Sequence, residues 1–336
     1  MSKKIKFYIL FFSILITTNI VKSQDANFSQ FYANYLYLNP ALTGNRSNPT
    51  LSLNYRNQWP ALSNSFVNYH ASYDCYFDKL RSGIGVSFLG DNAGDGTLKT
   101  NIVSGFYSYH LQISNSIFIN AGFEASYYQA KLDWDKLEFA DQFDPRYGFV
   151  LPSNEIQPAN LSKSFVDFSS GCFIGISQKY FIGFSINHLT QPNNSFYNNS
   201  DSKLQTKITV HAGTIINISD IGNSSPGFED ITIHPNILYQ QQGEFKQINL
   251  GMYLKKHPFV TGLWFRHNMS NSDALIILIG IEQKTYTVGY SYDFTVSKLK
   301  NINTGGGHEI SFSYKFPEFP ARRKRIRARD MEVPPF

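Results

Sequence analysis

Residues 116–132 read SIFINAGFEASYYQAKL, and apolar side chains alternate along them with small or polar ones. In an extended chain one side would carry Ile117, Ile119, Ala121, Phe123, Ala125 and Tyr127, and the other Ser116, Asn120, Gly122, Glu124 and Ser126, with Phe118 as the exception. A period of two residues is typical of a β-strand with one apolar face. The stretch therefore predicts a strand whose apolar face is covered by lipid or by a core.

The same alternation recurs along most of the chain. It predicts roughly fourteen strands, an even number that suits a closed antiparallel barrel with both termini on one side of a membrane. The expected strands lie near residues 50–57, 65–76, 83–89, 98–111, 116–131, 165–176, 180–188, 203–218, 231–240, 245–254, 258–267, 273–281, 286–293 and 309–316.

The connections between these strands differ in length at the two ends of the expected barrel. If the chain starts in the periplasm, the inner turns are FDKLRS, ISNS, SQK, SDIGNSSPGFED, KKH and EQKT, which are short with one exception. Three outer loops, at 132–164, 189–202 and 294–308, are long. Short inner turns and long outer loops are typical of outer-membrane barrels.

Composition favours a membrane barrel over a secreted β-sandwich. Charged residues make up 16% of the chain and aromatic residues another 16%, whereas soluble domains contain about 25% charged residues. A sandwich needs charged outer faces for solubility, but the faces opposite the apolar ones are mainly Gly, Ser, Asn and Thr. Such small polar residues suit a hydrated or plugged lumen. We therefore expect an all-β transmembrane antiparallel β-barrel over residues 50–316.

The N-terminus, MSKKIKFYILFFSILITTNIVKSQ, has the order of a secretory signal peptide: a basic start, an apolar run over 7–21 and a small residue, Ser23. The alternative is a membrane-anchoring helix, but the run has only about 15 residues where a spanning helix needs about 20. We expect a signal peptide over residues 1–23 with cleavage near Ser23 and Gln24. No later stretch approaches 18 consecutive apolar residues, so any span has to be made by strands.

Several long motifs resemble one family. The mature chain opens with DANFSQFYANYLYLNPALTG at 25–44 and continues with YRNQWP at 55–60, GIGVSFLGDNAGDGTL at 83–98, SYHLQI at 108–113, DPRYG at 144–148, INHLTQPNNSF at 186–196, LYQQQGEFKQINLGMYL at 238–254, GLWFRHN at 262–268 and GGGHEISFSYKF at 305–316. In this order they resemble the PorP/SprF family, outer-membrane proteins of the Bacteroidetes type IX secretion and gliding apparatus. The resemblance implies an integral outer-membrane barrel whose N-terminal signature lies close to the periplasmic side.

Residues 24–49 precede the first strand and must lie in the periplasmic mouth or fold into the lumen. Their apolar side chains would be costly to leave in water, so we expect them to pack against the inner wall as a small plug. Asn39-Pro40 would form a turn and Gly44 a bend into the first strand. A flexible lead-in is the alternative. The candidate residues of this signature are Phe28, Ser29, Gln30, Tyr37, Asn39, Pro40 and Gly44, and the other large side chains are Phe31, Tyr32, Tyr35 and Leu38.

The C-terminal tail, residues 317–336, is rich in proline and arginine, which excludes a strand or a long helix. We expect it to be periplasmic, where it meets no nucleic acid. Its six cations are either a contact strip for a periplasmic partner, through paired Arg–carboxylate bonds, or a solvated or lipid-bound tail. They are Arg322, Arg323, Lys324, Arg325, Arg327 and Arg329.

No motif of an enzyme is present. The histidines lack metal-ligand spacing, no Cys-x-x-Cys occurs, and neither a GxSxG elbow nor a Walker loop is found. Lumen-facing Arg266 and Glu124 are interpreted as members of a structural ion network. We therefore expect no catalytic residue, no metal site, no cofactor and no enzymatic activity.

The expected function is that of an interaction protein. The resemblance implies an outer-membrane component of type IX secretion that binds a periplasmic ring, a lipoprotein or a peptidoglycan-binding subunit, or holds the C-terminal domain of a secreted cargo or adhesin at the cell surface. Aromatic residues of the outer loops would be anchors for such a cargo. They are Trp134, Phe143, Tyr147, Phe196 and Tyr197. The alternative is a FadL-like channel for hydrophobic solutes, in which the plug moves.

Overall fold

The computed structural model describes residues 24–46, 48–62, 65–197, 202–218, 231–269, 271–296, 304–317, 334 and 336. The signal peptide predicted over 1–23 and the six cations of the tail lie outside these residues. The strands of the main sheet are β1 (Thr50–Gln58), β2 (Phe66–Phe77), β3 (Ser82–Ala93), β4 (Leu98–Gln112), β5 (Ile117–Leu132), β8 (Ser162–Ile176), β9 (Tyr180–Asn187), β10 (Lys207–Thr214), β11 (Ile216–Asn217), β12 (Ile231–Gln242), β13 (Phe245–Lys256), β14 (Phe259–Asn268), β15 (Asn271–Glu282), β16 (Tyr286–Thr295) and β17 (Gly307–Lys315).

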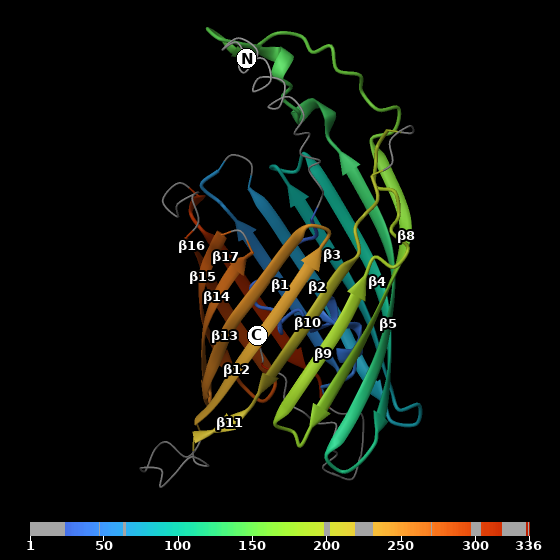
Figure 1. Ribbon diagram of the computed structural model, residues 1–336, viewed down its shortest axis with the longest axis vertical. Coiled ribbons are helices and arrows are strands. Elements are labelled where there is room, and N and C mark those ends of the chain that lie inside the picture. The colour runs from blue at the N-terminus through green and yellow to red at the C-terminus, as the bar shows by residue number, and fades with distance from the viewer. Residues whose placement is uncertain are drawn as a thin grey trace, which may run out of the picture.

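The sheet closes on itself into a barrel (Figure 1). β17 pairs with both β16 and β1, and β10 pairs with both β9 and β12, always antiparallel. β10 and β11 keep one register against β12 and are two pieces of one strand, interrupted at Ile215. Counted so, the 15 strands of the described sheet are 14 in the barrel. The predicted all-β antiparallel barrel of about fourteen strands is confirmed.

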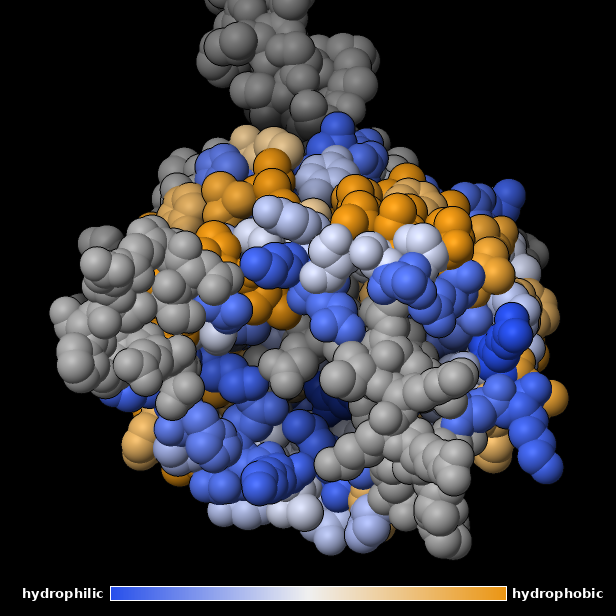
Figure 2. Space-filling view, turned by 90° about the horizontal axis from the view of Figure 1, so that it is seen from below, coloured by the Kyte–Doolittle hydropathy of each residue, from blue (hydrophilic) through white to orange (hydrophobic). Residues whose placement is uncertain are grey.

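Alternation separates the two faces of each strand as predicted. On β3 and β4, Val86 and Val103 point outward and are more than half exposed, at 56% and 54%, while their neighbours Ser87 and Ser104 are buried inside. Seen from the lower end of the barrel, hydrophilic residues lie toward the middle and along the lower edge of the view, and hydrophobic ones gather mainly along the upper part of the rim (Figure 2). Because every backbone group of a closed barrel can pair within the sheet, an apolar outer wall can face lipid.

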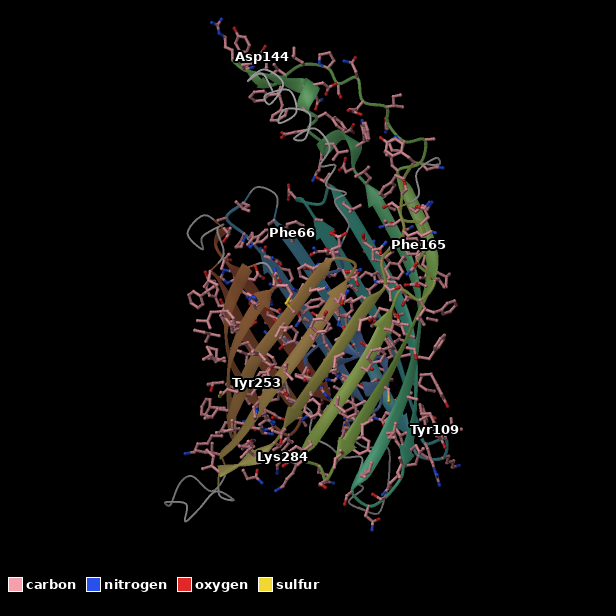
Figure 3. The ribbon with its side chains drawn as sticks, in the orientation of Figure 1. Phe66, Tyr109, Asp144, Phe165, Tyr253 and Lys284 are labelled. Atoms are coloured by element: carbon pink, nitrogen blue, oxygen red, sulfur yellow. The ribbon has the colours of Figure 1, made fainter. Side chains whose placement is uncertain are left out.

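The two ends of the barrel differ in their connections. Residues 78–81, 113–116, 177–179, 257–258 and 283–285 form short turns at one end, hereafter the short-turn end. Residues 133–161 and 188–206 are long loops at the other, the long-loop end. The first of these loops carries η2 (Trp134–Lys136), η3 (Ala140–Gln142) and the small β6 (Phe143–Asp144) and β7 (Gly148–Phe149) pair. It reaches far beyond the barrel, with Asp144 near its tip (Figure 3).

Helices contribute little to the described part of the chain. The short α2 (Tyr35–Leu38) and η1 (Pro40–Leu42) lie inside the barrel, before β1. Among the described residues, no helix has the length and the apolar character that crossing a membrane would require. Cys75 and Cys172 are free thiols.

Candidate functional site: a plug in the barrel lumen

Residues 24–46, called here the plug, run through the lumen from one end of the barrel to the other. Asp25 lies at the long-loop end, where its main-chain N–H donates to Gln242 at the end of β12. Gly44 lies at the short-turn end, beside Gly83 at the start of β3. The chain then turns into β1. Because β1 begins at the short-turn end, only the last part of the signature lies there, and its first residues lie at the opposite mouth.

The middle of the plug is compact because of its local sequence. Asn39 separates α2 from η1, and its side-chain Oδ1 accepts a hydrogen bond of 2.9 Å from the N–H of Ala41. Pro40 follows as the first residue of η1, where a missing N–H costs nothing. Gly44 has φ +69°, and a Cβ there would lie 2.5 Å from the Cα of Gly83. Only glycine fits this bend.

Aromatic residues of the plug form a core with the inner wall. Phe31 lies edge-on to Trp264 of β14, with ring centroids 5.1 Å apart. Tyr32 lies edge-on to Phe181 of β9 at 5.9 Å. Within the plug, Tyr37 donates a hydrogen bond to the carbonyl of Ala26. Phe28, Phe31, Tyr32, Tyr35, Leu36, Leu38, Ala41 and Leu42 are each at most 5% exposed. Edge-to-face contacts of this kind add to the free energy of burial.

Two arginines and two carboxylates bind the part of the plug nearer the long-loop end, and we call these four side chains the latch. Arg56 Nη2 lies 2.8 Å from Asp293 Oδ2, and Arg56 Nη1 lies 3.1 Å from Glu309 Oε2. Arg266 Nη1 lies 3.0 Å from Asp293 Oδ2. Ser29 sits between them: its Oγ accepts from both arginines, at 2.7 and 2.6 Å, and donates to Asp293. Paired charges with these extra bonds are the form in which ions are tolerated in a protein interior.

The main chain of the plug is bound to the wall as well. The N–H groups of Ser29 and Gln30 donate to the two oxygens of Glu309, at 2.6 and 3.1 Å. Lower down, Asp74 of β2 accepts from the N–H of Gly44 at 2.6 Å and from the hydroxyl of Tyr35. These wall groups pair main-chain N–H groups of plug residues that lie outside α2 and η1 and would otherwise be buried without a partner. The inner wall is thus complementary to the plug.

Glycines in the wall make room for the plug backbone. A Cβ added to Gly122 of β5 would lie 2.5 Å from the Cα of Ala41. At Gly171 of β8 an added Cβ would overlap the side chain of Asn39, which donates hydrogen bonds to the wall carbonyls of β8 and β9. A glycine in the middle of a strand often marks a place where another part of the chain approaches the strand this closely.

We expect Gly122→Val to displace the plug from the inner wall at β5. The added side chain meets plug backbone, and such overpacking costs about 1–3 kcal/mol. The measurement is the rate at which a membrane-impermeant maleimide modifies Ala41→Cys, in a chain whose Cys75 and Cys172 are serine. The rate should rise roughly tenfold. The matched control is Gly105→Val, since nothing lies within 4 Å of a Cβ at Gly105. Equal rates in the two variants would contradict this role of Gly122.

The first residues of the plug are held at the long-loop end by a second charged cluster. His188 lies with Nε2 2.9 Å from Asp25 Oδ2 and Nδ1 2.6 Å from Asp167 Oδ2. Lys207 Nζ is 3.5 Å from Asp25 Oδ2. Burial alone would lower the pKa of His188, but the two carboxylates outweigh it and raise the pKa to about 9. The imidazole is therefore charged at neutral pH and forms ion pairs with both carboxylates.

The aromatic candidates of the outer loops lie on two neighbouring loops. Trp134, Phe143 and Tyr147 are on loop 133–161, and Phe196 and Tyr197 are on loop 188–206. The hydroxyl of Tyr197 donates to the carbonyl of Ile156, which joins the two loops. Tyr147 is 70% exposed and Ile156 79%, whereas Trp134 packs on Phe139 at 4.9 Å.

Three latch residues, Arg56, Asp293 and Glu309, are absent from the site residues predicted from the sequence. Arg266 and Glu124 both face the lumen, as expected. Arg266 belongs to an ion network, whereas Glu124 accepts a hydrogen bond from Ser126 on β5. Each of these three latch residues is a charged side chain on the polar, inward side of an alternating segment. Charges on the inward side of a barrel strand need partners, and this rule could have linked them. Among the described residues, no group of three or more His, Cys, Asp or Glu side chains is placed to hold a metal ion.

Comparison with known proteins identifies the chain as follows. Residues 20–314 match the family described as "Type IX secretion system membrane protein PorP/SprF". No curated protein matches the sequence. Among solved structures, the Ralstonia pickettii toluene transporter TbuX is similar with a TM-score of 0.50 and 10% identity, over 84% of this chain and 93% of that one. The P. putida toluene transporter TodX is similar with a TM-score of 0.50 and 9% identity, over the same shares. The Acinetobacter baumannii outer membrane protein Omp33 is similar with a TM-score of 0.43 and 10% identity, over 82% of this chain and 100% of that one.

Proposed function

The chain belongs to the PorP/SprF family of type IX secretion system membrane proteins and is integral to the outer membrane. We propose that it is a non-enzymatic binding component of that secretion system. In this proposal the barrel is a closed scaffold, and the protein works by holding partners at its two ends. Those partners are other secretion components on the periplasmic side and the C-terminal domain of a secreted cargo or adhesin at the surface.

The filled lumen is the observation that carries the proposal. The plug occupies the barrel from Asp25 at one mouth to Gly44 at the other, and the wall binds it through the latch, through Asp74 and through His188. A barrel whose interior is committed to its own chain has its free surface at its ends. Function is then expected in the loops, which are positioned by the rigid wall.

The long loop 133–161 has the character of a contact surface. Besides Tyr147 and Ile156 it exposes further large apolar side chains, and it does so beyond the barrel and away from the lipid-facing wall (Figure 3). They are Phe143 at 51%, Phe149 at 49%, Val150 at 60% and Leu151 at 46%. Clusters of exposed apolar residues that are not needed to meet lipid mark protein interaction sites. Aromatic anchors among them are the residue types enriched in such interfaces.

A channel for hydrophobic solutes is the second candidate. The likeness to two toluene transporters supports a shared fold but not a shared substrate, because the sequence identities are only 10% and 9%. Solute passage needs an apolar path through the lumen. The described inner wall instead presents many buried polar side chains, among them Asn54, Asn120, Ser185 and Asn249. For this reason we place the binding role first.

The proposal is tested by affinity purification of the native protein from outer membranes, followed by mass spectrometry. We expect secretion components and a surface cargo to be recovered. In a variant with Phe143, Tyr147, Phe149 and Ile156 changed to serine, the surface cargo should be lost by on the order of tenfold or more, because a few large apolar anchors dominate an interface, while periplasmic partners remain.

The matched control changes exposed apolar residues of the short-turn end, Leu80 and Ile113, which are 59% and 58% exposed. This variant should keep the surface cargo. Recovery of only lipids or small hydrophobic molecules, with no secretion component in any sample, would refute the binding role and favour the channel.

A further inference from the structure

The lumen holds a second segment of this chain besides the plug. The ring of Phe336 is 1% exposed and belongs to the hydrophobic cluster inside the barrel. The hydroxyl of Tyr253 donates a hydrogen bond of 2.5 Å to the main-chain oxygen of Phe336. Tyr253 lies on β13 in the lower half of the barrel (Figure 3). Pro334 is buried as well.

The wall at this place is built to leave a space. On β13 and β14, an inward aromatic residue lies opposite an inward glycine and covers it. Trp264 pairs with Gly251, and Tyr253 pairs with Gly262. A Cβ added to Gly262 would lie 2.9 Å from the ring of Tyr253. Covering a strand glycine with an aromatic ring from the paired strand is a general device of β-sheets.

On the next two strands this device is incomplete. Gly280 of β15 pairs with Gly289 of β16, so neither strand supplies a ring. The ring of Phe336 lies over this pair: a Cβ on Gly280 would be 2.6 Å from its Cε2, and a Cβ on Gly289 would be 2.5 Å from its Cδ1. The phenylalanine thus provides the aromatic cover that the paired strand does not.

We propose that Gly280, Gly289 and Tyr253 form a binding notch for a phenylalanine presented by a proline-rich peptide, and that Phe336 of this chain is its resident ligand. The ring packs on the glycine pair, where no side chain is in the way, and the Tyr253 hydroxyl donates a hydrogen bond to the main chain of the peptide. The wall aromatics Trp264 and Tyr253 form one side, and Gln30 of the plug lies beside Gly289. The notch lies near the 283–285 turn, so it is reached from the short-turn end. This inference goes beyond the proposed function and does not depend on it.

The chemistry of the site defines its ligand. An aromatic ring fits a floor that lacks side chains, and neighbouring aromatic rings add favourable edge contacts. Proline restricts the unbound peptide and lowers the entropy lost on binding. The segment of the chain that matches the family ends at residue 314, so Phe336 lies outside the matched region.

The experiment measures binding of a fluorescent peptide with capped ends and the sequence of residues 331–336, MEVPPF, to purified protein in detergent. The receptor is the chain without residues 334–336, which removes Phe336 from the notch. We expect saturable binding, and binding to the full chain at least tenfold weaker because Phe336 competes in the same molecule. A peptide ending in alanine in place of phenylalanine should bind roughly tenfold to a hundredfold more weakly.

Variants of the shortened chain locate the site. Gly289→Val should abolish binding, whereas Gly105→Val on the lipid face should leave it unchanged. If Gly289→Val fails to fold, judged by circular dichroism, Tyr253→Phe decides the matter: it keeps the ring, removes the donor and should weaken binding severalfold. Equal binding by the full and shortened chains, no binding to the shortened chain, or full binding by either notch variant would overturn the proposal.

Discussion

Arg56→Met is expected to lower the free energy of unfolding of the barrel by about 3–5 kcal/mol, which is the usual result of breaking a buried ion pair by removing one partner. The Arg56 side chain is 1% exposed and contacts both Asp293 and Glu309. Without it, Asp293 keeps Arg266 as its cationic partner, whereas Glu309 keeps only the hydrogen bonds from Ser29, Gln30 and Asn54. The measurement is denaturant unfolding of the purified protein in detergent, where the midpoint should fall while the slope stays constant.

A second substitution separates charge from shape. In the double variant Arg56→Met, Glu309→Gln, the latch keeps Arg266 and Asp293 as a neutral pair. Part of the lost free energy should return, with a coupling of roughly 1–3 kcal/mol. The matched control is Lys136→Met on the outer loop, where Lys136 Nζ lies 3.9 Å from the exposed Asp95 and a surface pair contributes about 0–1 kcal/mol. If Arg56→Met costs no more than Lys136→Met, the latch does not hold the protein together.

The barrel could be predicted because each strand carries its own evidence. Segments such as 286–293 and 309–316 alternate over their whole length, and β16 and β17 lie there. A one-residue shift would turn every apolar side chain into the lumen, so alternation specifies the face of each residue as well as the strand. The exact bounds of a strand are harder to predict: the strand expected over 203–218 is present, but it begins at Lys207 and is interrupted at Ile215, between β10 and β11.

The interior could be predicted only in part. Aromatic residues ahead of the first strand indicated a buried segment, because large apolar side chains are costly in water. The direction of that segment through the lumen depends on contacts between residues far apart in sequence. Arg56 on β1 faces Glu309 on β17 only because the barrel closes. No local pattern brings Ser29 between them, and none indicates that Phe336 covers two glycines of the wall.

Deletion of residues 25–44 is expected to turn a closed barrel into an open channel. Eight-stranded barrels are filled by their own side chains, while barrels of about 16–18 strands leave an aqueous channel; a barrel of this intermediate width is closed by the plug. The strands pair with one another without the plug, so the wall should still form and its inward polar groups should be hydrated. Single-channel conductance in planar lipid bilayers and uptake of small sugars by liposomes should rise from background to the level of an open pore. The control removes residues 137–156, an equally long piece of the outer loop, and should stay closed. A deletion variant that keeps the far-ultraviolet circular dichroism of a β-barrel yet conducts no more than this control would show that the plug does not close the lumen.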